Sequence, residues 1–385
     1  MAAIFSNLSN ITYQQVIMWA IGGVLIYLAV KRDMEPALLL PIGFGAILVN
    51  LPMSGAITQT IERVVGGVLH IETEVGALST LNAAGIANEL FPLLLFVGIG
   101  AMIDFGPLLS NPRLLFFGAA AQFGIFVTFS LASLIGFSFQ DAASISIIGA
   151  ADGPTSIFVA NYFSSNYLGP IIVAAYSYMA LVPIIQPPII RLVTTRKERL
   201  IRMKYEQRDV SRLTRILFPI IVTVVAGLFA PKAVALVGFL MFGNLIRECG
   251  VLDSLSNTAQ KELANLITLL LGITVAVNMR ADQFLNPTTL MILGLGLVAF
   301  IFDTVGGVLF AKFLNLFLKE KLNPMIGATG ISAFPMSARV VHKMALQEDP
   351  TNHILMHAIG ANVSGQIASV IAGGLVIRLV ESLIK

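Results

Sequence analysis

Charge is scarce in this sequence. Only 12% of its 385 residues are Asp, Glu, Lys or Arg, whereas 56% are hydrophobic. A soluble globular protein of this size needs a far larger charged surface, so the composition excludes that class. The mean hydropathy of +0.86 indicates a polytopic membrane protein instead. Because several apolar runs approach or exceed the ~20 residues that cross a bilayer, we expect an all-α membrane protein rather than a β-barrel.

Cysteine pairs, metal-binding clusters and phosphate-binding motifs are also missing. The single cysteine, Cys249, allows no internal disulfide, and no group of His and Cys has metal-binding spacing. Glycine-rich stretches such as Gly294-Leu295-Gly296 indicate close helix contacts rather than phosphate loops, because no strand precedes them and no lysine follows. We therefore do not expect ATP-driven transport within this chain. Residues 1–15 lack a basic segment before the first apolar run, so we expect no cleavable signal peptide.

Positive charge is concentrated in one segment. Its basic residues are Arg196, Lys197, Arg199, Arg202, Lys204, Arg208, Arg212 and Arg215. The positive-inside rule puts this segment on the cytoplasmic side together with Lys31, Arg32 and Arg113, and the loop at 53–90 outside. The segment fits a cytoplasmic loop that contacts anionic membrane lipids better than it fits a nucleic-acid-binding patch.

Apolar runs predict the membrane helices. They lie near residues 15–30, 37–52, 91–108, 113–137 and 170–194 before the basic segment, and near 213–230, 232–247, 263–280, 288–316 and 352–380 after it. This pattern predicts about five passes in each half. Within the loop at 53–90, Ile57–His70 is a candidate interfacial helix.

Short matches relate the two halves of the chain. Leu-Leu-Leu at 93–95 recurs at 269–271, Asn111-Pro112 as Asn286-Pro287, Ile148-Gly149-Ala150 as Ile326-Gly327-Ala328, and Ile190–Val193 as Ile377–Val380. Matches in the same order indicate a duplicated unit, and an odd number of passes per unit makes the two repeats inverted. We expect a first membrane repeat at 1–195, a basic cytoplasmic linker at 196–212 and a second repeat at 213–385.

One acid interrupts the apolar sequence between the predicted helices at 113–137 and 170–194. This acid is Asp152, and a carboxylate at membrane depth is costly and marks an ion or proton path. The neighbouring Gly149, Gly153 and Pro154 predict an unwound or re-entrant segment near 147–160. The duplication predicts a second broken segment near 323–338. Two such segments that meet would build one ion site.

Oxygen-bearing side chains beside these breaks suit sodium, which is a hard cation. They are Asp152, Thr155, Asn323, Ser332, Asn362 and Ser364. Tyr176 and Tyr178 add phenols inside an apolar helix. For each neutral residue, a hydrogen bond between helices is the alternative role. Arg339 either holds a carboxylate or marks the cytoplasmic boundary. Asp303 is a second acid within a helix, and it is either a proton site or a structural partner of Arg339.

Four motifs resemble one family over nearly the whole chain. They are Gly149–Thr155, Ala174–Pro183 with its Tyr178, Asn323–Arg339 and Met356–Gly365. By these motifs the sequence resembles the β subunits of the sodium-pumping, biotin-dependent decarboxylases, which act on oxaloacetate, methylmalonyl-CoA, glutaconyl-CoA or malonate. Gly149-Ala150 stands where the family has a Gly-Gly pair, a departure that leaves Asp152 unaltered.

The resemblance implies an activity and partners. A carboxyltransferase α subunit would load a biotin carrier subunit, and carboxybiotin would be decarboxylated at the cytoplasmic face of this chain. That step consumes a proton and would drive sodium outward. A small single-span membrane subunit, a homo-oligomer within the complex, and the inner membrane of a bacterial or archaeal cell are implied as well, with no nucleic-acid partner.

The resemblance also implies site residues. In the family, the positions that match Asp152, Tyr178, Asn323, Gly327, Ser332, Arg339 and Asn362 take part in sodium binding and coupling. We therefore predict Asp152, Tyr178 and Arg339 as catalytic residues, with Arg339 also contacting carboxybiotin. The predicted sodium ligands are Asp152, Asn362, Asn323 and Ser332.

Two other function classes fit part of the pattern. A sodium-coupled secondary carboxylate transporter or a sodium/proton antiporter would share the inverted repeats and broken helices, and it would need no biotin partner. A purely structural membrane anchor for a soluble enzyme fits less well, because polar residues lie at two broken segments.

Overall fold

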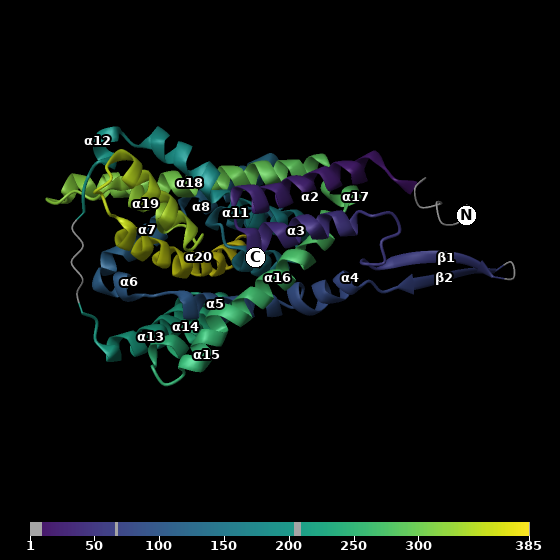
Figure 1. Cartoon of the computed structure of the whole chain (residues 1–385), viewed down its shortest axis with the longest axis horizontal. Helices are drawn as coiled ribbons and strands as arrows, with labels where there is room; N and C mark the ends of the chain where they lie inside the picture. The colour runs from purple at the N-terminus through teal and green to yellow at the C-terminus, as the bar shows by residue number, and fades with distance from the viewer. Residues whose placement is uncertain (1–9, 66–67, 204–208, 385) are drawn as a thin grey trace. The chain divides into compact units, whose positions relative to one another are not determined.

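The computed structural model describes residues 10–65, 68–203 and 209–384, and most of these are helical (Figure 1). Among them, seven helices are long and apolar enough to cross a membrane, or up to eight if the bent pair Ala77–Ile86 and Leu90–Met102 is one span. The predicted all-α polytopic membrane protein is confirmed. The inverted relation of two repeats stays a prediction. Lys204 and Arg208 of the predicted linker lie outside the described residues.

The chain forms two compact units, one of residues 1–92 with 265–291 and one of residues 93–264 with 292–385. Three helices contain a unit boundary, namely α5 (Leu90–Met102), α16 (Ala264–Val275) and α18 (Pro287–Phe317). The first unit begins with α2 (Tyr13–Arg32) and α3 (Pro36–Val49). A Cβ on Gly22 or Gly43 would lie 2.7 Å from the carbonyl oxygen of the other glycine. Small residues thus let these two helices approach closely.

A β-hairpin replaces the interfacial helix predicted at Ile57–His70. Strand β1 (Gln59–Val65) pairs antiparallel with β2 (Val68–Glu74), and Gln59 lies opposite Glu74. The helix prediction is therefore wrong. The sequence carries the strand signal, because both segments are rich in β-branched residues and the sequence between them is Gly66-Gly67.

Short elements complete the first unit. They are α4 (Ala77–Leu81), the π-helical turn η2 (Asn82–Ile86), the 3-10 turn η7 (Ala276–Met279) and α17 (Ala281–Phe284). Buried Asn50 ties α3 to the last two, since its Nδ2 donates to Ala46 O and Met279 O at 2.8 Å each and its Oδ1 accepts from Ala281 N at 2.7 Å. A buried amide with its hydrogen bonds made fixes the chain path.

The second unit holds the remaining helical elements. They are α6 (Gly106–Ser110), η3 (Pro112–Leu114), α7 (Leu115–Ala121), α8 (Phe123–Ile135), α9 (Phe139–Ser146), η4 (Ile147–Ala150), α10 (Gly153–Tyr162), α11 (Leu168–Val193), α12 (Arg196–Arg199), α13 (Arg212–Phe229), η5 (Pro231–Ala233), α14 (Val234–Glu248), α15 (Asp253–Thr258), η6 (Ala259–Leu263), η8 (Pro324–Gly330), α19 (Met336–Glu348) and α20 (Leu355–Ile384). Most predicted helices match these bounds closely, although the one predicted at 91–108 is divided into α5 and α6 and Gln122 interrupts the one predicted at 113–137. Both predicted breaks are present, as 3-10 turns η4 and η8.

Helix α20 is the central element of the second unit. It contacts α7, η8, α19 and α10, and more than half of its residues are buried. A Cβ on its Gly365 would lie 2.4 Å from Gly330 O, and one on Gly373 would lie 2.8 Å from the Thr155 side chain. These glycines therefore let α20 touch both broken segments.

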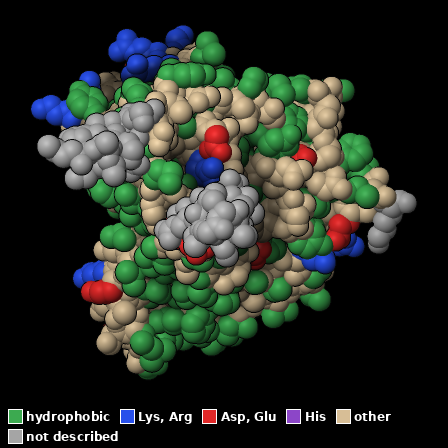
Figure 2. Space-filling model, turned by 90° about the vertical axis from the view of Figure 1, so that its right-hand side faces the viewer, with side chains coloured by type: hydrophobic (Ala, Val, Ile, Leu, Met, Phe, Trp, Pro, Cys, Tyr) green, Lys and Arg blue, Asp and Glu red, His purple; other side chains and the backbone are tan. Residues whose placement is uncertain are grey.

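Hydrophobic side chains cover much of the surface seen in Figure 2, where charged groups lie in a few places. Large exposed hydrophobic residues include Leu134, Leu192, Leu228 and Leu316. An exposed apolar surface of this extent is what a bilayer covers.

Candidate functional site

Asp152 begins helix α10. It follows the 3-10 turn η4 and Ala151, whose φ of 53° is left-handed, and its own extended backbone makes it the N-cap residue of α10. Its Oδ1 accepts a long hydrogen bond of 3.4 Å from Thr155 N. An aspartate N-cap followed by Pro154 in the first turn is a strong helix start, so the local sequence explains the break.

Hydroxyl groups surround the Asp152 carboxylate, which is only 4% exposed. Thr155 Oγ1 donates to Asp152 Oδ2 at 2.7 Å, and Ser369 Oγ of α20 donates to the same oxygen at 3.0 Å. Burial of a carboxylate is costly unless donors compensate it, and here two hydroxyls do so. Oδ1 is engaged more weakly, by Thr155 N alone among the described residues.

The two broken segments touch one another at this point. Ser332 N donates to Ala150 O at 3.0 Å, which joins the chain two residues after η8 to the end of η4. Ser332 Oγ donates to Gly365 O of α20 at 3.0 Å, and Gln366 Nε2 donates to Ser332 O. The contact between discontinuous segments that the duplication predicts is therefore present, with α20 against both.

Asn362 holds the second broken segment. Its Nδ2 donates to Thr329 O at 3.1 Å and to Ile331 O at 2.7 Å. Its Oδ1 is buried and accepts no hydrogen bond from the described residues. A buried amide oxygen of this kind is a suitable ligand for a hard cation.

Tyr176 and Tyr178 lie in different surroundings. A Cβ on Gly153 would lie 2.3 Å from a ring carbon of Tyr176, so the Tyr176 ring lies against the start of α10. The Tyr178 hydroxyl instead donates to Leu293 O of α18 at 2.5 Å. Thus Tyr176 lies against the segment that carries Asp152, whereas the hydroxyl of the predicted catalytic residue Tyr178 donates to α18.

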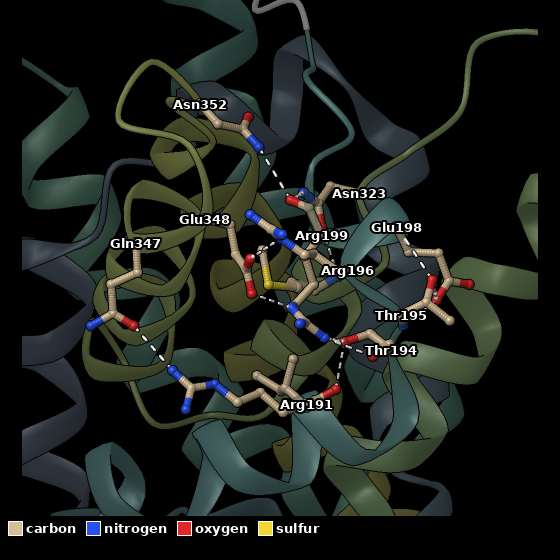
Figure 3. A network of polar contacts seen from close by, with 12 residues as sticks. Arg191, Thr194, Thr195, Arg196, Glu198, Arg199, Asn323, Gln347, Glu348 and Asn352 are labelled. Atoms are coloured by element: carbon tan, nitrogen blue, oxygen red, sulfur yellow. Dashed lines mark hydrogen bonds and ion pairs between the residues drawn. The ribbon is translucent and has the colours of Figure 1, made fainter.

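Asn323 lies in a polar network with the basic segment (Figure 3). Its Nδ2 donates to Arg199 O at 2.8 Å and to Ile201 O at 3.0 Å, and its Oδ1 accepts from Met325 N at 3.1 Å. Asn352 Nδ2 donates to the same two carbonyls. Both the nitrogen and the oxygen of the Asn323 side-chain amide are therefore hydrogen-bonded, and these bonds fix the linker to the start of η8.

Ion pairs strengthen this network. Arg199 Nε lies 2.7 Å from Glu348 Oε1, and Arg196 Nε lies 3.4 Å from Glu348 Oε2 (Figure 3). The hydrogen bond from Arg199 lowers the pKa of the Glu348 carboxyl below its usual range. The beginning of the basic linker is thereby anchored to the end of α19.

Arg339 and Asp303 lie apart from each other. The Arg339 side chain is exposed in the first turn of α19 and forms no ion pair with any described residue. Asp303 is completely buried in α18, where its Oδ1 accepts from Ile125 N at 3.2 Å. The suggested pairing of these two residues is therefore absent from the part of the chain that the structure describes.

Ser369 and Gln366 join the site although the sequence did not single them out. Gln366 and Ser369 follow Asn362 on α20 at spacings of four and seven residues, which places all three on one helical face. That periodicity is the signal that would have found them.

Neutral oxygen donors around one acid characterise the site. Among the described residues, no group of three or more His, Cys, Asp or Glu can hold a metal ion. A transition metal is therefore a poor match, whereas a single carboxylate with hydroxyl and amide oxygens matches a monovalent hard cation.

Comparison with known proteins identifies the family. Residues 14–380 match the family described as Na+-transporting oxaloacetate decarboxylase beta subunit. The chain belongs to this family. The methylmalonyl-CoA decarboxylase subunit beta of Propionigenium modestum is 49% identical over 94% of each chain. The probable oxaloacetate decarboxylase beta chain of Vibrio cholerae is 45% identical over 97% of each, and the glutaconyl-CoA decarboxylase subunit beta of Acidaminococcus fermentans is 45% identical over 96% of this chain and 94% of its own.

Family membership confirms the predicted function class. The protein is a multi-pass membrane subunit of a sodium-translocating decarboxylase, and it acts as one subunit of a larger enzyme.

Proposed function

We propose that Asp152 binds the transported sodium ion and that this subunit couples its release to decarboxylation of carboxybiotin. The observation that carries the proposal is the buried Asp152 carboxylate, whose Oδ2 accepts two hydroxyls while Oδ1 accepts one long bond. Asn362 and Ser332 complete the proposed ligand set, with Asn323 as the remaining predicted ligand. The unpartnered Oδ1 of Asn362 among the described residues supports this role.

Protonation of Asp152 is the proposed release step. A neutral carboxyl group no longer attracts a cation, so proton uptake weakens sodium binding. Export of one charge against a membrane potential requires about 2.3 kcal/mol per 100 mV, and the affinity for sodium must therefore differ between the two orientations of the site. In the proposed cycle, the repeats at 1–195 and 213–385 move around the site, and the linker at 196–212 stays cytoplasmic.

Arg339 is the proposed contact for carboxybiotin. Its exposed guanidinium has no described ion-pair partner, and a planar guanidinium binds a carboxylate through two parallel hydrogen bonds. The chemistry that carboxybiotin supplies is cleavage of its N–C bond, which releases CO2 while the ring nitrogen takes up a proton. Tyr178 and Asp152 are the proposed groups of this chain on the path of that proton.

The partners follow from the same proposal. We infer a carboxyltransferase α subunit, a biotin carrier and a small single-span membrane subunit, with several copies of this chain in the complex. The relatives are named for methylmalonyl-CoA, oxaloacetate and glutaconyl-CoA, so the acid is proposed to be chosen by the carboxyltransferase. The inner membrane of a bacterial or archaeal cell is the proposed location.

Reconstitution of the complex in liposomes tests the proposal. With carboxybiotin and radioactive sodium, the wild type should accumulate sodium, and Asp152→Asn should abolish both sodium transport and sodium-stimulated decarboxylation. Asp104→Asn is the control, because Asp104 accepts from Gly106 N at 2.8 Å in a turn without Ser or Thr donors from the described residues. Sodium-stimulated turnover in Asp152→Asn would overturn the assignment. Sodium/proton exchange without carboxybiotin would favour an antiporter instead.

A further inference from the structure

Asp303 is a buried acid to which the proposed cycle gives no role. It lies in the long helix α18 and is 0% exposed. Its Oδ1 accepts a hydrogen bond of 3.2 Å from Ile125 N, in the first turn of α8. The same amide also donates to Gln122 O, just before α8, at 3.2 Å, so Asp303 shares this first-turn amide and caps α8 from a different helix.

Two glycines make room for this carboxylate. A Cβ on Gly124 would lie 2.5 Å from Asp303 Oδ1, and a Cβ on Gly149 would lie 2.6 Å from Asp303 Oδ2. Any larger residue at either position would therefore displace the acid or the backbone that faces it. Oδ2 accepts no hydrogen bond from the described residues, so its contact with Gly149 is a van der Waals packing contact.

Gly149 belongs to the turn that precedes Asp152. The next residue, Ala150, accepts from Ser332 N of the second broken segment, and Tyr176 lies against Gly153 on the other side of Asp152. The backbone that presents Asp152 is thus held from three directions. Asp303 supplies the contact from α18, and it joins the start of α8 to Gly149, the third residue of η4.

We propose that Asp303 is a positioning residue that holds η4, and through it Asp152, in the geometry that binds sodium. This inference rests on the proposed role of Asp152. Residues that support a metal ligand without touching the metal fix the orientation of that ligand, and their loss lowers metal affinity or activity by about 10- to 100-fold. Asp303 positions η4 through two properties: its Oδ1 accepts a hydrogen bond from Ile125 N, and its carboxylate fills the space beside Gly149.

The test measures the sodium concentration for half-maximal decarboxylation in the reconstituted complex, together with the thermal unfolding of each variant with and without sodium. Asp303→Ala should raise that concentration by about 10- to 100-fold. Asp303→Asn keeps an acceptor oxygen and the shape, so it should restore the value to within about threefold of wild type. Thr304→Val is the matched control, because Thr304 is also buried in α18 and its hydroxyl has no described partner.

A second variant covers the case in which Asp303→Ala does not fold. Gly149→Ala perturbs the same contact from the other side and should raise the sodium requirement in the same way. An unchanged sodium requirement in folded Asp303→Ala or in Gly149→Ala would overturn the inference, and so would Asp303→Asn that is as impaired as Asp303→Ala. Loss of sodium-dependent stabilisation in Asp152→Asn, measured alongside, shows that the proposed sodium site itself stands. Retention there would instead refute the proposed function.

Discussion

The two broken segments contribute different things to the site. The first segment, around η4 and Asp152, supplies the acid. The Asp152 carboxylate accepts one hydroxyl from Thr155 and one from Ser369 of α20. The second, around η8 and Ser332, has no acid, and its contacts run through backbone groups to Asn362 and Ala150. A site with one negative charge and neutral oxygen donors suits a monovalent cation, so the difference between the segments sets the charge of the site.

The segments also meet α18 differently. A Cβ on Gly149 of the first segment would first meet side-chain atoms, Asp303 Oδ2 at 2.6 Å and Ala299 Cβ at 2.7 Å. A Cβ on Gly327 of the second segment would instead meet backbone, 2.0 Å from Gly307 O. A side chain adjusts more readily than a backbone carbonyl does. The second segment is therefore expected to tolerate less change than the first.

Substitution at Gly327 should have the largest effect on stability. Gly327→Ala forces the backbones of η8 and α18 apart, and overpacking typically costs about 1–3 kcal/mol; we expect this close backbone contact to lie at the upper end of that range. We expect little folded protein by size-exclusion chromatography and a much lower unfolding temperature. Gly294→Ala is the control in α18, because a Cβ there meets nothing within 4 Å. Equal yields for the two variants would contradict the close backbone contact.

Asn362→Ala should have the next largest effect. It leaves Thr329 O and Ile331 O without their donor, at a cost of about 1–3 kcal/mol, and it removes a proposed sodium ligand. We expect sodium half-saturation of decarboxylation to rise about 10- to 100-fold. Asn315→Ala is the control, since Asn315 makes two hydrogen bonds to Leu322 at 2.7 Å away from the breaks. If both variants lost stability and neither changed the sodium requirement, Asn362 would be structural only.

Much of this arrangement could be predicted from the sequence, because breaks and buried acids leave local signals. Gly149, Gly153 and Pro154 mark the first break, and a duplicated motif locates the second. The hairpin at β1 and β2 was missed, because hydropathy does not separate a strand pair from a short interfacial helix when its Gly66-Gly67 turn signal is ignored.

Long-range contacts could not be predicted in the same way. Neither the spacing nor the composition places Ser369 beside Asp152, which is 217 residues away, or the Asp303 side chain beside Gly149. Asn323 carries a strong motif, yet in the structure its amide holds the linker carbonyls. Such pairings depend on how α18 and α20 cross the breaks, and a single sequence does not encode that crossing in any local pattern.

Ser369→Ala should have a smaller effect, on the segment that carries Asp152. It removes one of two hydroxyl donors from Asp152 Oδ2, which is worth about 1–2 kcal/mol, while Thr155 remains. We expect the sodium requirement to rise up to roughly tenfold with a nearly unchanged unfolding temperature. Ser382→Ala is the control on α20, because among the described residues Ser382 donates only to Leu379 O of its own helix. A loss of stability without a change in sodium dependence would separate Ser369 from the site.

The smallest effect should come from the ion pair that anchors the linker to α19, next to the second broken segment. Arg199 lowers the pKa of Glu348, so the pair stabilises the folded state at neutral pH, and this contribution is lost as the pH falls below the ordinary carboxyl value of 4.5. Glu348→Gln should lower the stability at pH 7 by about 0.5–1 kcal/mol, because the pair is partly exposed to solvent. The difference in unfolding temperature between wild type and variant should therefore shrink on acidification.

Glu320→Gln is the control for this last change, since Glu320 is exposed and forms no ion pair with the described residues. At each pH in the same range, this variant should have the same unfolding temperature as the wild type. A wild-type advantage over Glu348→Gln that stays constant down to pH 3 would mean that charge is not what holds the linker. In that case Asn323 and Asn352, whose amides bind the same two carbonyls without titrating, would be sufficient to anchor it, and the second broken segment would depend on neutral contacts throughout.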